Sequence, residues 1–591
     1  MANSLDNDFV GSGADSGSAA FGMSAGDAAA GCGETAAPRR PWVRIITMGC
    51  AKNEADSDRM RAALESAGFY VETSSLVGAG AAADDDGGWD DSWDDGDADW
   101  DAGEDWDFVD GEDVADAAVT GSDAAGLLPD VTLINTCSFI TGATQESIDA
   151  IFAVVEERSE LTGGRPLGEG DSKIVVAGCI PSRYGDGISR EIPEVDAFVS
   201  VEDEDRIVSV LSDLIGFDSG SVSEGAPAPR TTGQPFAYVK ISDGCDRFCS
   251  FCTIPYIRGR YESRSARQII DEVRFLVEGG TREIVLVGQD TGIWGDDLAE
   301  RAAYEPLERP TLASLMGYLA QAFPHTWIRV MYLQPERTDD ELLAVMARYP
   351  NVCSYLDIPL QHASAKVVSE MNRKGSGDEY LELLQHVRAE VPGITMRTTV
   401  ISGFPGETEE ESDELVGFMR DAAFDFAGVF EYSREDGTVA GEREDQVPGD
   451  VAVERANEVR EAIEECGVAS AAARVGKVYE VLVCGVAEVD DEFDASSAPA
   501  MGAGLEASSK GSPKWSASSG IAAGSDAAAG SRELAATAPD VPVALWGRAQ
   551  FQAPEVDSVI YFEGSPALVG SFVEVEVVGS MGYDLEGEVL A

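Results

Sequence analysis

The sequence predicts a multidomain α/β protein with three folded parts: a small α/β domain, a partial barrel of six βα units and a small antiparallel β-barrel. Three observations lead to this fold class. Near the N-terminus a strand, a cysteine and a helical pattern follow one another three times. In the middle of the chain six apolar strands alternate with helical patterns, and the last part holds five short alternating strands. A chain of 591 residues is long enough for three or four domains.

The N-terminal domain is expected at 41–216, and each of its strands ends just before a cysteine. The strands are expected at 43–47, 131–134 and 173–177, and the cysteines are Cys50, Cys137 and Cys179. Parallel strands end at one edge of a sheet, so these thiols can converge there. Three such thiolates could hold an iron–sulfur cluster. The alternative is three buried apolar cysteines, because free cysteine is among the most buried residue types.

The partial barrel is expected at 235–470. Its six strands are expected at 237–241, 283–287, 328–332, 355–359, 395–401 and 428–432. Six units are too few to close an eightfold barrel, but functional sites of such barrels still gather at the carboxyl ends of the strands. A cysteine-rich loop follows the first of these strands, which is where a barrel site should be.

The C-terminal barrel is expected at 475–591. Its five strands are expected at 478–483, 543–549, 558–562, 572–578 and 585–590. From 541 to 591 the chain carries eight acidic residues and one basic residue, Arg548. An RNA-binding barrel should be basic because phosphate contacts dominate affinity. This composition favours a basic protein as the partner and makes nucleic acid an unlikely main target.

Four segments have the composition of tails, insertions or linkers: 1–40, 76–128, 217–234 and 487–540. The stretch 84–116 holds 17 Asp or Glu and no Lys or Arg, interleaved with Trp. We expect a solvated, disordered insertion there, since such a run cannot pack a core. The alternative is an acidic arm that grips a basic partner.

Composition bounds the compartment and the partners. The formal net charge is −66, which repels nucleic acid. The sequence has no apolar run of 18 residues and no readable signal peptide, so we expect no membrane span and a cytoplasmic protein. Ten cysteines in 591 residues are too few for a disulfide scaffold, and six of them fall in motifs better explained as thiolate ligands.

Cys245, Cys249 and Cys252 form a C-x3-C-x2-C loop after the first barrel strand. Three thiolates on one tight loop can hold three irons of a cubic cluster and leave the fourth iron open to a ligand. The alternative is a structural zinc site. Structural zinc is bound by four ligands, but the next cysteine after this loop is the distant Cys353. The same spacing resembles that of the radical S-adenosylmethionine enzymes, in which the open iron binds S-adenosylmethionine and one electron splits it to a 5′-deoxyadenosyl radical.

The motifs Met-Gly-Cys50-Ala-Lys-Asn, Asn-Thr-Cys137-Ser-Phe-Ile and Ala-Gly-Cys179-Ile, followed by the barrel loop, resemble the methylthiotransferases. The resemblance implies an N-terminal methylthiotransferase domain, a radical S-adenosylmethionine barrel and a C-terminal TRAM barrel. It implies two 4Fe-4S clusters, one on each cysteine triplet, and S-adenosylmethionine as methyl donor and radical source. No catalytic residue beyond the cluster ligands is expected. An electron donor such as flavodoxin or ferredoxin, and a sulfur donor, are implied as partners.

Further cofactor contacts are predicted around the barrel strands. They are Gly279, Gly280, Gln289, Ser402, Gly403 and Glu407. Paired glycines let the backbone approach a ligand closely, and a helix C-cap is the alternative for Gly279 and Gly280. The loop that begins at Ser402 resembles an adenosyl-contact loop. His362 could act as an acid–base group, but we expect a surface or hydrogen-bonding role for it.

The branch of the family decides the expected substrate. Gly-Cys50-Ala-Lys-Asn stands where the RNA-modifying branches carry Gly-Cys-Gln-Met/Val-Asn, so the chain resembles the branch that modifies an aspartate β-carbon in ribosomal protein S-twelve. The charge of the C-terminal barrel agrees with this choice. Two alternatives stay open: methylthiolation of a modified adenosine in transfer RNA, and a non-catalytic iron–sulfur scaffold or electron carrier.

Overall fold

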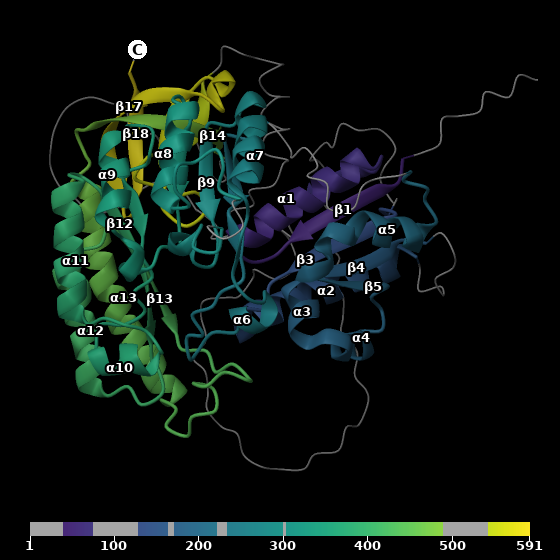
Figure 1. Ribbon diagram of the computed structural model, residues 1–591, viewed down its shortest axis with the longest axis horizontal. Coiled ribbons are helices and arrows are strands. Elements are labelled where there is room, and N and C mark those ends of the chain that lie inside the picture. The colour runs from purple at the N-terminus through teal and green to yellow at the C-terminus, as the bar shows by residue number, and fades with distance from the viewer. Residues whose placement is uncertain are drawn as a thin grey trace, which may run out of the picture. The chain divides into compact units, whose positions relative to one another are not determined.

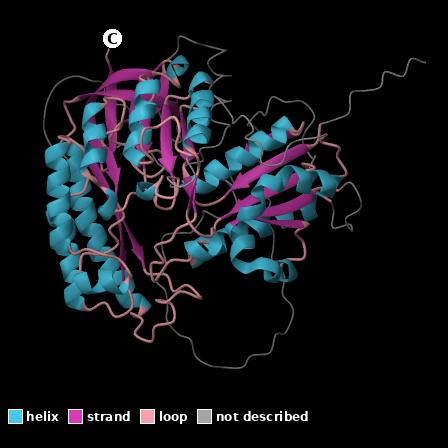
Figure 2. Cartoon of the chain, viewed as in Figure 1, coloured by secondary structure: helices cyan, strands magenta, loops and turns pink. Residues whose placement is uncertain are grey.

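The computed structural model describes residues 40–74, 128–162, 171–220, 233–298, 303–487 and 542–590 (Figures 1 and 2). The N-terminal tail, nearly all of the acidic insertion, most of the 217–234 linker and nearly all of the second low-complexity insertion lie outside these ranges.

The N-terminal domain is built on a parallel five-stranded sheet in the order β2-β1-β3-β4-β5. Its strands are β1 (Trp42–Thr47), β2 (Tyr70–Ser74), β3 (Val131–Thr136), β4 (Lys173–Gly178) and β5 (Ala197–Ser200). The predicted strands correspond to the three central ones. The two edge strands were missed because each buries only one side chain, Val71 or Val199, and so lacks an apolar pattern.

Helices cover both faces of this sheet (Figure 1). They are α1 (Ala51–Ser66), α2 (Thr141–Leu161), α3 (Cys179–Tyr184), α4 (Ile188–Glu191) and α5 (Ile207–Ile215), with the short 3-10 turns η1 (Gly185–Gly187) and η2 (Val201–Arg206). Side chains alternate along the strands, so Ile45 and Leu133 join one apolar cluster and Ile46 and Ile134 join another. Helix α1 begins directly after Cys50.

The barrel consists of two parallel three-stranded sheets, in the orders β10-β9-β6 and β11-β12-β13. The strands are β6 (Phe236–Lys240), β9 (Glu283–Val287), β10 (Trp327–Val330), β11 (Tyr355–Asp357), β12 (Thr395–Ser402) and β13 (Phe426–Glu431). A parallel bridge between Ile328 and Val352 links the two sheets. Each strand lies within two residues of its predicted bounds, and all but β13 are mostly buried, which favours the apolar and β-branched residues that mark them in the sequence.

Helices pack on the outer face of the barrel. They are α7 (Ala266–Glu278), α8 (Leu312–Ala322), α9 (Asp340–Arg348), α10 (Ala365–Glu370), α11 (Gly377–Glu390), α12 (Glu409–Ala422) and α13 (Gly449–Ala472). The short helix α6 (Ile254–Ile257) lies instead against α3 of the N-terminal domain (Figure 1). Short turns η3 (Thr291–Ile293) and η4 (Pro335–Arg337) and the small ribbon β7 (Ser242–Asp243) and β8 (Glu262–Ser263) complete this part. Ala237, Val239 and Ile241 face the helices, whereas Tyr238 faces inward.

The inward face of the barrel is filled by neighbouring domains. Tyr238, Trp327 and Tyr355 pack in one apolar cluster with Leu482 and Ala553 from the C-terminal part and with residues of α1. Because other domains occupy this part of the interior, the carboxyl ends of the strands are the part of the barrel left for a site.

The C-terminal part forms a closed five-stranded barrel. Its strands are β14 (Val478–Val486), β15 (Val543–Ala549), β16 (Ile560–Gly564), β17 (Phe572–Met581) and β18 (Asp584–Val589), with the turn η5 (Pro566–Leu568). Four of the five neighbouring pairs are antiparallel, as predicted, and the pair β16 and β18 runs parallel. An odd number of strands cannot alternate in direction all the way round a closed ring, so one parallel pair is unavoidable.

A buried ion network attaches this barrel to the central one. Glu283 at the start of β9 accepts from Arg329 at 2.7 Å and from Arg548 of β15 at 2.6 Å, and all three side chains are at most 1% exposed. Burial acts to raise the pKa of Glu283, but the two guanidinium groups hold it below its ordinary value. The one basic residue of the last 51 residues is therefore used internally.

Candidate functional site

Cys50, Cys137 and Cys179, which we call the edge cysteines, lie at the carboxyl edge of three adjacent strands. The register pairs Thr47 with Asn135 and Thr136 with Gly178, so β1, β3 and β4 end side by side. Cys137 and Cys179 are buried and Cys50 is half-buried. The parallel sheet therefore brings together three thiols that are far apart in the sequence.

Two glycines make this convergence possible. Gly49 has φ +104°, and a Cβ there would lie 2.6 Å from Cβ of Cys137. Gly178 has φ +91°, and a Cβ there would lie 2.4 Å from Oδ1 of Asn135. Both positions need the left-handed region and the close backbone approach that only glycine allows without strain.

Buried amides hold the loops around the edge cysteines. Asn53 Nδ2 donates to the carbonyl of Thr136 at 2.9 Å, and Asn135 Nδ2 donates to the carbonyl of Asn53 at 3.0 Å and to Ser57 Oγ at 2.9 Å. These bonds tie the start of α1 to the end of β3, so the positions of Cys50 and Cys137 are set by one network.

The chemistry of the edge cysteines fits thiolate ligation of an iron–sulfur cluster. Burial raises the pKa of Cys137 to about 12, and the neighbouring Cys50 and Cys179 add to the rise. The same thiols repel one another as thiolates because they are close. Coordination to a metal removes that cost, since a coordinating thiol is deprotonated outright.

Cys245, Cys249 and Cys252, which we call the loop cysteines, follow β6 at the carboxyl edge of the barrel. Gly244 has φ +69°, and a Cβ there would lie 2.1 Å from the carbonyl oxygen of Arg260, so the chain can turn only with glycine at this point. The amide of Cys252 donates to the carbonyl of Cys249 at 3.0 Å. Burial raises the pKa of Cys252 to about 12, and Cys249 and then Cys245 raise it further, so these thiols also lie together.

Polar contacts anchor the loop cysteines to residues that follow other barrel strands. Arg247 Nε donates to Asp290 Oδ2 at 2.5 Å, which joins the loop to the segment after β9. Arg373 Nη1 lies 3.8 Å from Cys249 Sγ, while its Nη2 donates to Gln334 Oε1 at 2.5 Å and to the carbonyl of Pro359 at 2.8 Å. The segments after β6, β9, β10 and β11 therefore meet at one edge.

The segment after β12 reaches the same edge through apolar packing. Phe251, between Cys249 and Cys252, packs in one cluster with Ile401, Phe404 and Tyr432. The loop that begins at Ser402 thus lies beside the loop cysteines.

Two predicted cofactor contacts carry buried polar atoms that lack a protein partner. Both amide atoms of Gln289, and the Oγ of Ser402, are buried and make no hydrogen bond within the described part of the chain. Such orphaned groups are costly unless a ligand satisfies them. Gln289 follows β9 and Ser402 ends β12, so the residues at this edge fit a polar cofactor such as S-adenosylmethionine.

Glu407 and Gly403 have other partners in the structure. Glu407 Oε2 accepts from the amides of Gly403 at 3.0 Å and Phe404 at 3.2 Å, and its Oε1 accepts from Arg455 of α13 at 3.1 Å. A Cβ on Gly403 would lie 2.5 Å from Cβ of Ala452. These contacts account for both residues as supports of the loop. His362 is buried, and its Nδ1 accepts from the amide of Ser364 at 3.0 Å, so the expected hydrogen-bonding role is confirmed and a surface position is excluded.

The structure does not bring Gly279 and Gly280 to the cysteines. Gly279 caps α7 and Gly280 has φ +108°, and both precede β9 rather than follow it. Since β6 and β9 are parallel and in register, these glycines lie at the opposite edge from the loop cysteines. The alternative of a helix C-cap explains both residues.

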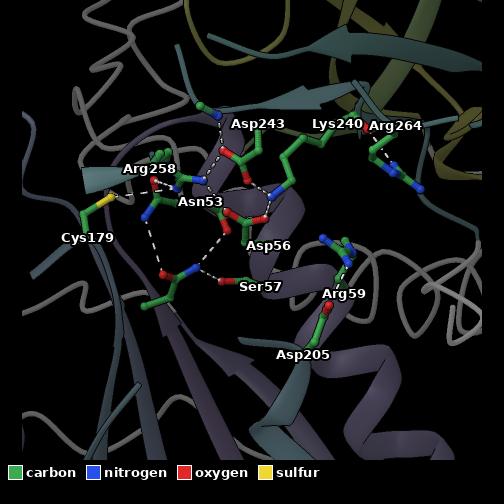
Figure 3. Close-up of polar contacts among 12 residues, drawn as sticks. Asn53, Asp56, Ser57, Arg59, Cys179, Asp205, Lys240, Asp243, Arg258 and Arg264 are labelled. Atoms are coloured by element: carbon green, nitrogen blue, oxygen red, sulfur yellow. Dashed lines mark hydrogen bonds and ion pairs between the residues drawn. The ribbon is translucent and has the colours of Figure 1, made fainter. Parts of the chain in front are cut away.

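A buried ion network runs from Cys179 to Asp243, which lies two residues before Cys245 (Figure 3). Arg258, at the end of α6, donates to Asp56 Oδ2 of α1 at 2.9 Å, and its Nη2 lies 3.8 Å from Cys179 Sγ. Lys240, the last residue of β6, also donates to Asp56, and it donates to Asp243 Oδ2 at 2.7 Å. Burial acts to raise the pKa of Asp56, but Lys240 and Arg258 hold it below its ordinary value. The edge cysteines and the loop cysteines therefore lie on either side of one ionic junction.

Hydrogen bonds of Thr253 and Glu435 also connect the barrel to the N-terminal domain near this junction. Thr253 Oγ1 donates to the carbonyl of Phe139 at 2.9 Å. Glu435, after β13, accepts from the amide of Thr141 at 2.6 Å and from Arg183 at 2.7 Å. In each of these bonds the residue of the N-terminal domain lies within four residues of Cys137 or Cys179 in the sequence, and Thr253 directly follows Cys252.

The sequence analysis missed the junction residues Asp56, Lys240 and Arg258. One signal was available for Lys240, because a lysine that ends the apolar strand Phe-Ala-Tyr-Val-Lys needs a buried partner. The identity of that partner, Asp56 in another domain, could not be read from the sequence.

Two further structural findings concern the described ranges only. Within them, no three His, Cys, Asp or Glu side chains converge on the position of a single metal ion. Each cysteine of a cubic cluster binds a different iron, so cluster ligation does not require such convergence. No helix in the same ranges is long and apolar enough to cross a membrane.

Comparisons with known proteins cover all three folded parts. Residues 239–419 match the Radical SAM superfamily, residues 538–590 match the TRAM domain, and residues 119–200 match a family described as Uncharacterized protein family UPF0004. The ribosomal protein uS12 methylthiotransferase RimO of Symbiobacterium thermophilum is 36% identical over 471 residues, which cover 78% of this chain and 83% of the relative. The protein of that name from Natranaerobius thermophilus is 30% identical over 93% of this chain and 98% of the relative.

The chain belongs to the RimO-type methylthiotransferases. It is an enzyme of the radical S-adenosylmethionine class, so S-adenosylmethionine and 4Fe-4S chemistry belong to its activity. The predicted fold class and enzyme class are confirmed, and neither of these two relatives favours the scaffold or transfer-RNA alternatives. A solved radical S-adenosylmethionine methyltransferase, TsrM from Kitasatospora setae, aligns with a TM-score of 0.44 at 14% identity over 68% of this chain and 74% of that one.

Proposed function

We propose that this methylthiotransferase holds two 4Fe-4S clusters and installs a methylthio group on the β-carbon of an aspartate in ribosomal protein uS12. The loop cysteines would ligate the cluster that binds S-adenosylmethionine, and the edge cysteines would ligate the cluster that handles sulfur. When bound, these groups supply the radical, the sulfur and the methyl group. One hydrogen of the β-carbon is then exchanged for sulfur carrying a methyl group, and that hydrogen leaves in 5′-deoxyadenosine.

The observation that carries the proposal is the ionic junction between two separate cysteine triplets. Arg258 and Lys240 from the barrel share Asp56 of α1, and Arg258 also contacts Cys179. A radical formed at one triplet and a sulfur held at the other must act on the same carbon atom, so the two sites have to be kept at a fixed separation. A buried charge network has the geometric specificity for this task.

The chain's own residues have three tasks in this scheme. Gln289 and Ser402 offer unsatisfied polar atoms to S-adenosylmethionine at the carboxyl edge. Glu407 holds the loop after Ser402 in shape through two backbone amides. Phe251 and Phe404 pack beside the loop cysteines and exclude water from the radical.

The proposal includes partners and domain limits. The radical step needs one electron from a donor of the flavodoxin or ferredoxin class, and the edge cluster needs a sulfur donor. The compartment is the cytoplasm, where both partners and nascent ribosomal proteins are available. We assign the functional units to 41–216, 235–470 and 475–591, and their folded elements support these limits.

Mass spectrometry of a strain without this gene tests the proposal. We expect uS12 to lose the mass of one methylthio substitution while transfer RNA keeps its modifications, and we expect the gene to restore the uS12 mass. Loss of a methylthio group from transfer RNA, with uS12 unchanged, would replace the protein substrate by RNA.

Iron analysis tests the cluster count. The anaerobically reconstituted chain should bind about eight irons, and the triple variant Cys245→Ala, Cys249→Ala, Cys252→Ala should bind about four. A folded triple variant that keeps all of its iron, or loses all of it, contradicts the assignment of one cluster to each triplet.

A further inference from the structure

Lys52 occupies an unusual place between the two cysteine groups. It is half-buried in the first turn of α1, two residues after Cys50. Its Nζ lies 3.9 Å from the ring centroid of Tyr332, which follows β10 of the barrel. The side chain therefore extends from the N-terminal domain to the carboxyl edge of the barrel.

The charge of Lys52 reaches both cysteine groups. It lowers the pKa of Cys50 against the rise that burial causes. Burial raises the pKa of Cys252 to about 12, and Lys52 is among the groups that oppose this rise. The Lys52 charge therefore acts on one thiol of each cysteine group.

The other cations beside the cysteines already have acceptors. Arg258 pairs with Asp56, and Arg247 pairs with Asp290. Arg373 donates to Gln334 and Pro359. By contrast, the Lys52 ammonium makes no hydrogen bond and no ion pair within the described part of the chain, although the chain carries 108 Asp and Glu against 42 Lys and Arg.

Two local costs meet at the Lys52–Tyr332 contact. A cation in the first turn opposes the positive end of the helix macrodipole. Tyr332 has φ +62°, a left-handed conformation that is unfavourable for a bulky side chain. Residues that break local rules in this way are concentrated at functional sites.

We infer that Lys52 binds the side-chain carboxylate of the aspartate that is to be modified and so selects an acidic residue as the substrate. The inference rests on the proposed function. The aspartate carboxylate is one bond from the β-carbon, so it must enter the space between the two cysteine groups together with that carbon. A carboxylate in a half-buried site needs a cationic partner, and the strongly acidic chain would otherwise repel it.

Substrate affinity provides the decisive measurement. Binding of purified uS12 to the reconstituted full chain would be measured without reductant, for native uS12 and for uS12 whose target Asp is changed to Asn. The wild-type chain should bind the Asp form about tenfold more tightly than the Asn form. In Lys52→Met this preference should disappear, because the methionine keeps the apolar contact with Tyr332 and lacks the charge. Lys52→Arg should restore most of it.

Arg59→Met is the matched control. Arg59 lies on the same helix, seven residues further along, and forms an exposed ion pair with Asp205 (Figure 3). Arg59→Met also removes one positive charge from α1, but at a position away from the cysteines. The variant should therefore keep the preference for Asp within about twofold of wild type. Reductive cleavage of S-adenosylmethionine without uS12 should be unchanged in Arg59→Met.

The outcomes separate this inference from the function on which it rests. If Lys52→Met keeps the wild-type preference for Asp, Lys52 does not recognise the carboxylate. If Lys52→Met instead weakens binding of S-adenosylmethionine and leaves the Asp preference intact, its ligand is the cofactor. If the wild-type chain neither binds nor modifies uS12, the proposed substrate is wrong and the inference falls with it. Lys52→Gln replaces Lys52→Met should the latter bind less iron than wild type.

Discussion

The loop cysteines and the edge cysteines reach similar groupings by opposite routes. The loop cysteines lie within eight residues, and a local turn at Gly244 sets their arrangement. The edge cysteines lie on three separate loops and meet only because β1, β3 and β4 are parallel neighbours. One site is a property of a short segment, and the other is a property of a whole sheet.

Their electrostatic surroundings differ as well. Arg247 beside the loop cysteines belongs to the same barrel and pairs with Asp290 of that barrel. Arg258 beside Cys179 comes from the other domain and is held by Asp56. The cation beside the edge cysteines, Arg258, therefore comes from the barrel and not from the domain that carries those cysteines. At the loop cysteines, the cation Arg247 and its partner Asp290 both come from the same barrel as the cysteines. Damage to the junction should affect the edge site first.

Removing each triplet in turn should give the largest difference. Changing the three edge cysteines to Ala should preserve reductive cleavage of S-adenosylmethionine, because the proposed function assigns that cleavage to the loop site. Changing the three loop cysteines to Ala should abolish cleavage. Methylthio product should vanish in both variants. Cleavage would be measured as the 5′-deoxyadenosine released. Full formation of the methylthio product without the edge cysteines would contradict their role in sulfur handling.

Gly178→Ala should damage the edge site strongly. The new Cβ would lie 2.4 Å from Asn135 Oδ1 and 2.8 Å from the Thr136 carbonyl, at φ +91°. We expect loss of the edge iron with the loop iron retained, and a lower free energy of unfolding by about 2–4 kcal/mol.

Gly216→Ala is the matched control for Gly178→Ala. Gly216 ends α5 at φ +67°, with nothing within 4 Å of an added Cβ, so only the backbone cost of about 1 kcal/mol applies. It should keep all of its iron. Equal iron loss in both glycine variants would show that backbone strain, rather than close approach to Asn135, governs the edge site.

Arg258→Gln should shift the reduction potential of the cluster on the edge cysteines, measured in a chain that lacks the loop cysteines. Removing a buried positive charge near Cys179 should move the reduction potential of that cluster to a more negative value, because the reduced form loses electrostatic stabilisation. Lys240→Gln disturbs the same Asp56 without touching a cysteine, so it should shift the potential less. Redox titration followed by electron paramagnetic resonance measures both, and equal shifts would assign the effect to Asp56.

A further expected effect concerns the pH dependence of stability and Glu204, in the turn η2 of the N-terminal domain. Burial raises the pKa of Glu204 to about 8, with Asp56 adding to the rise, and its Oε1 has no hydrogen-bond partner. The folded state therefore holds a proton that the unfolded state releases near pH 4.3. Stability should fall as pH rises from about 4 to 8 and then level off, since the folded state binds more protons in that window.

Glu204→Gln should remove this part of the pH dependence. The variant and the wild type should unfold alike near pH 4, and the variant should be the more stable one near pH 8. Denaturant unfolding at both pH values checks the sign. A wild type that becomes more stable relative to the variant on going to pH 8 would mean that Glu204 is ionised in the folded protein.

Much of the fold could be predicted because the central strands are buried and continuously apolar. The strands β9 and β15 match their predicted bounds, whereas the edge strands β2 and β5 were missed because each is largely uncovered. Which pair of the closed five-stranded ring runs parallel depends on the order of the strands in the barrel, which their sequences do not indicate.

The sequence by itself determined the two cysteine triplets, the order of the domains and the family. These features depend on residue spacing and on short periodic patterns, which are local properties of the chain. Only the tertiary structure decided that Arg258 and Lys240 share Asp56 across a domain junction, that Lys52 stacks on Tyr332, and that Gly279 lies at the far edge from the loop cysteines. Partners of buried charges are chosen by packing between distant segments, because a buried charge takes whichever opposite charge the fold brings within hydrogen-bonding distance.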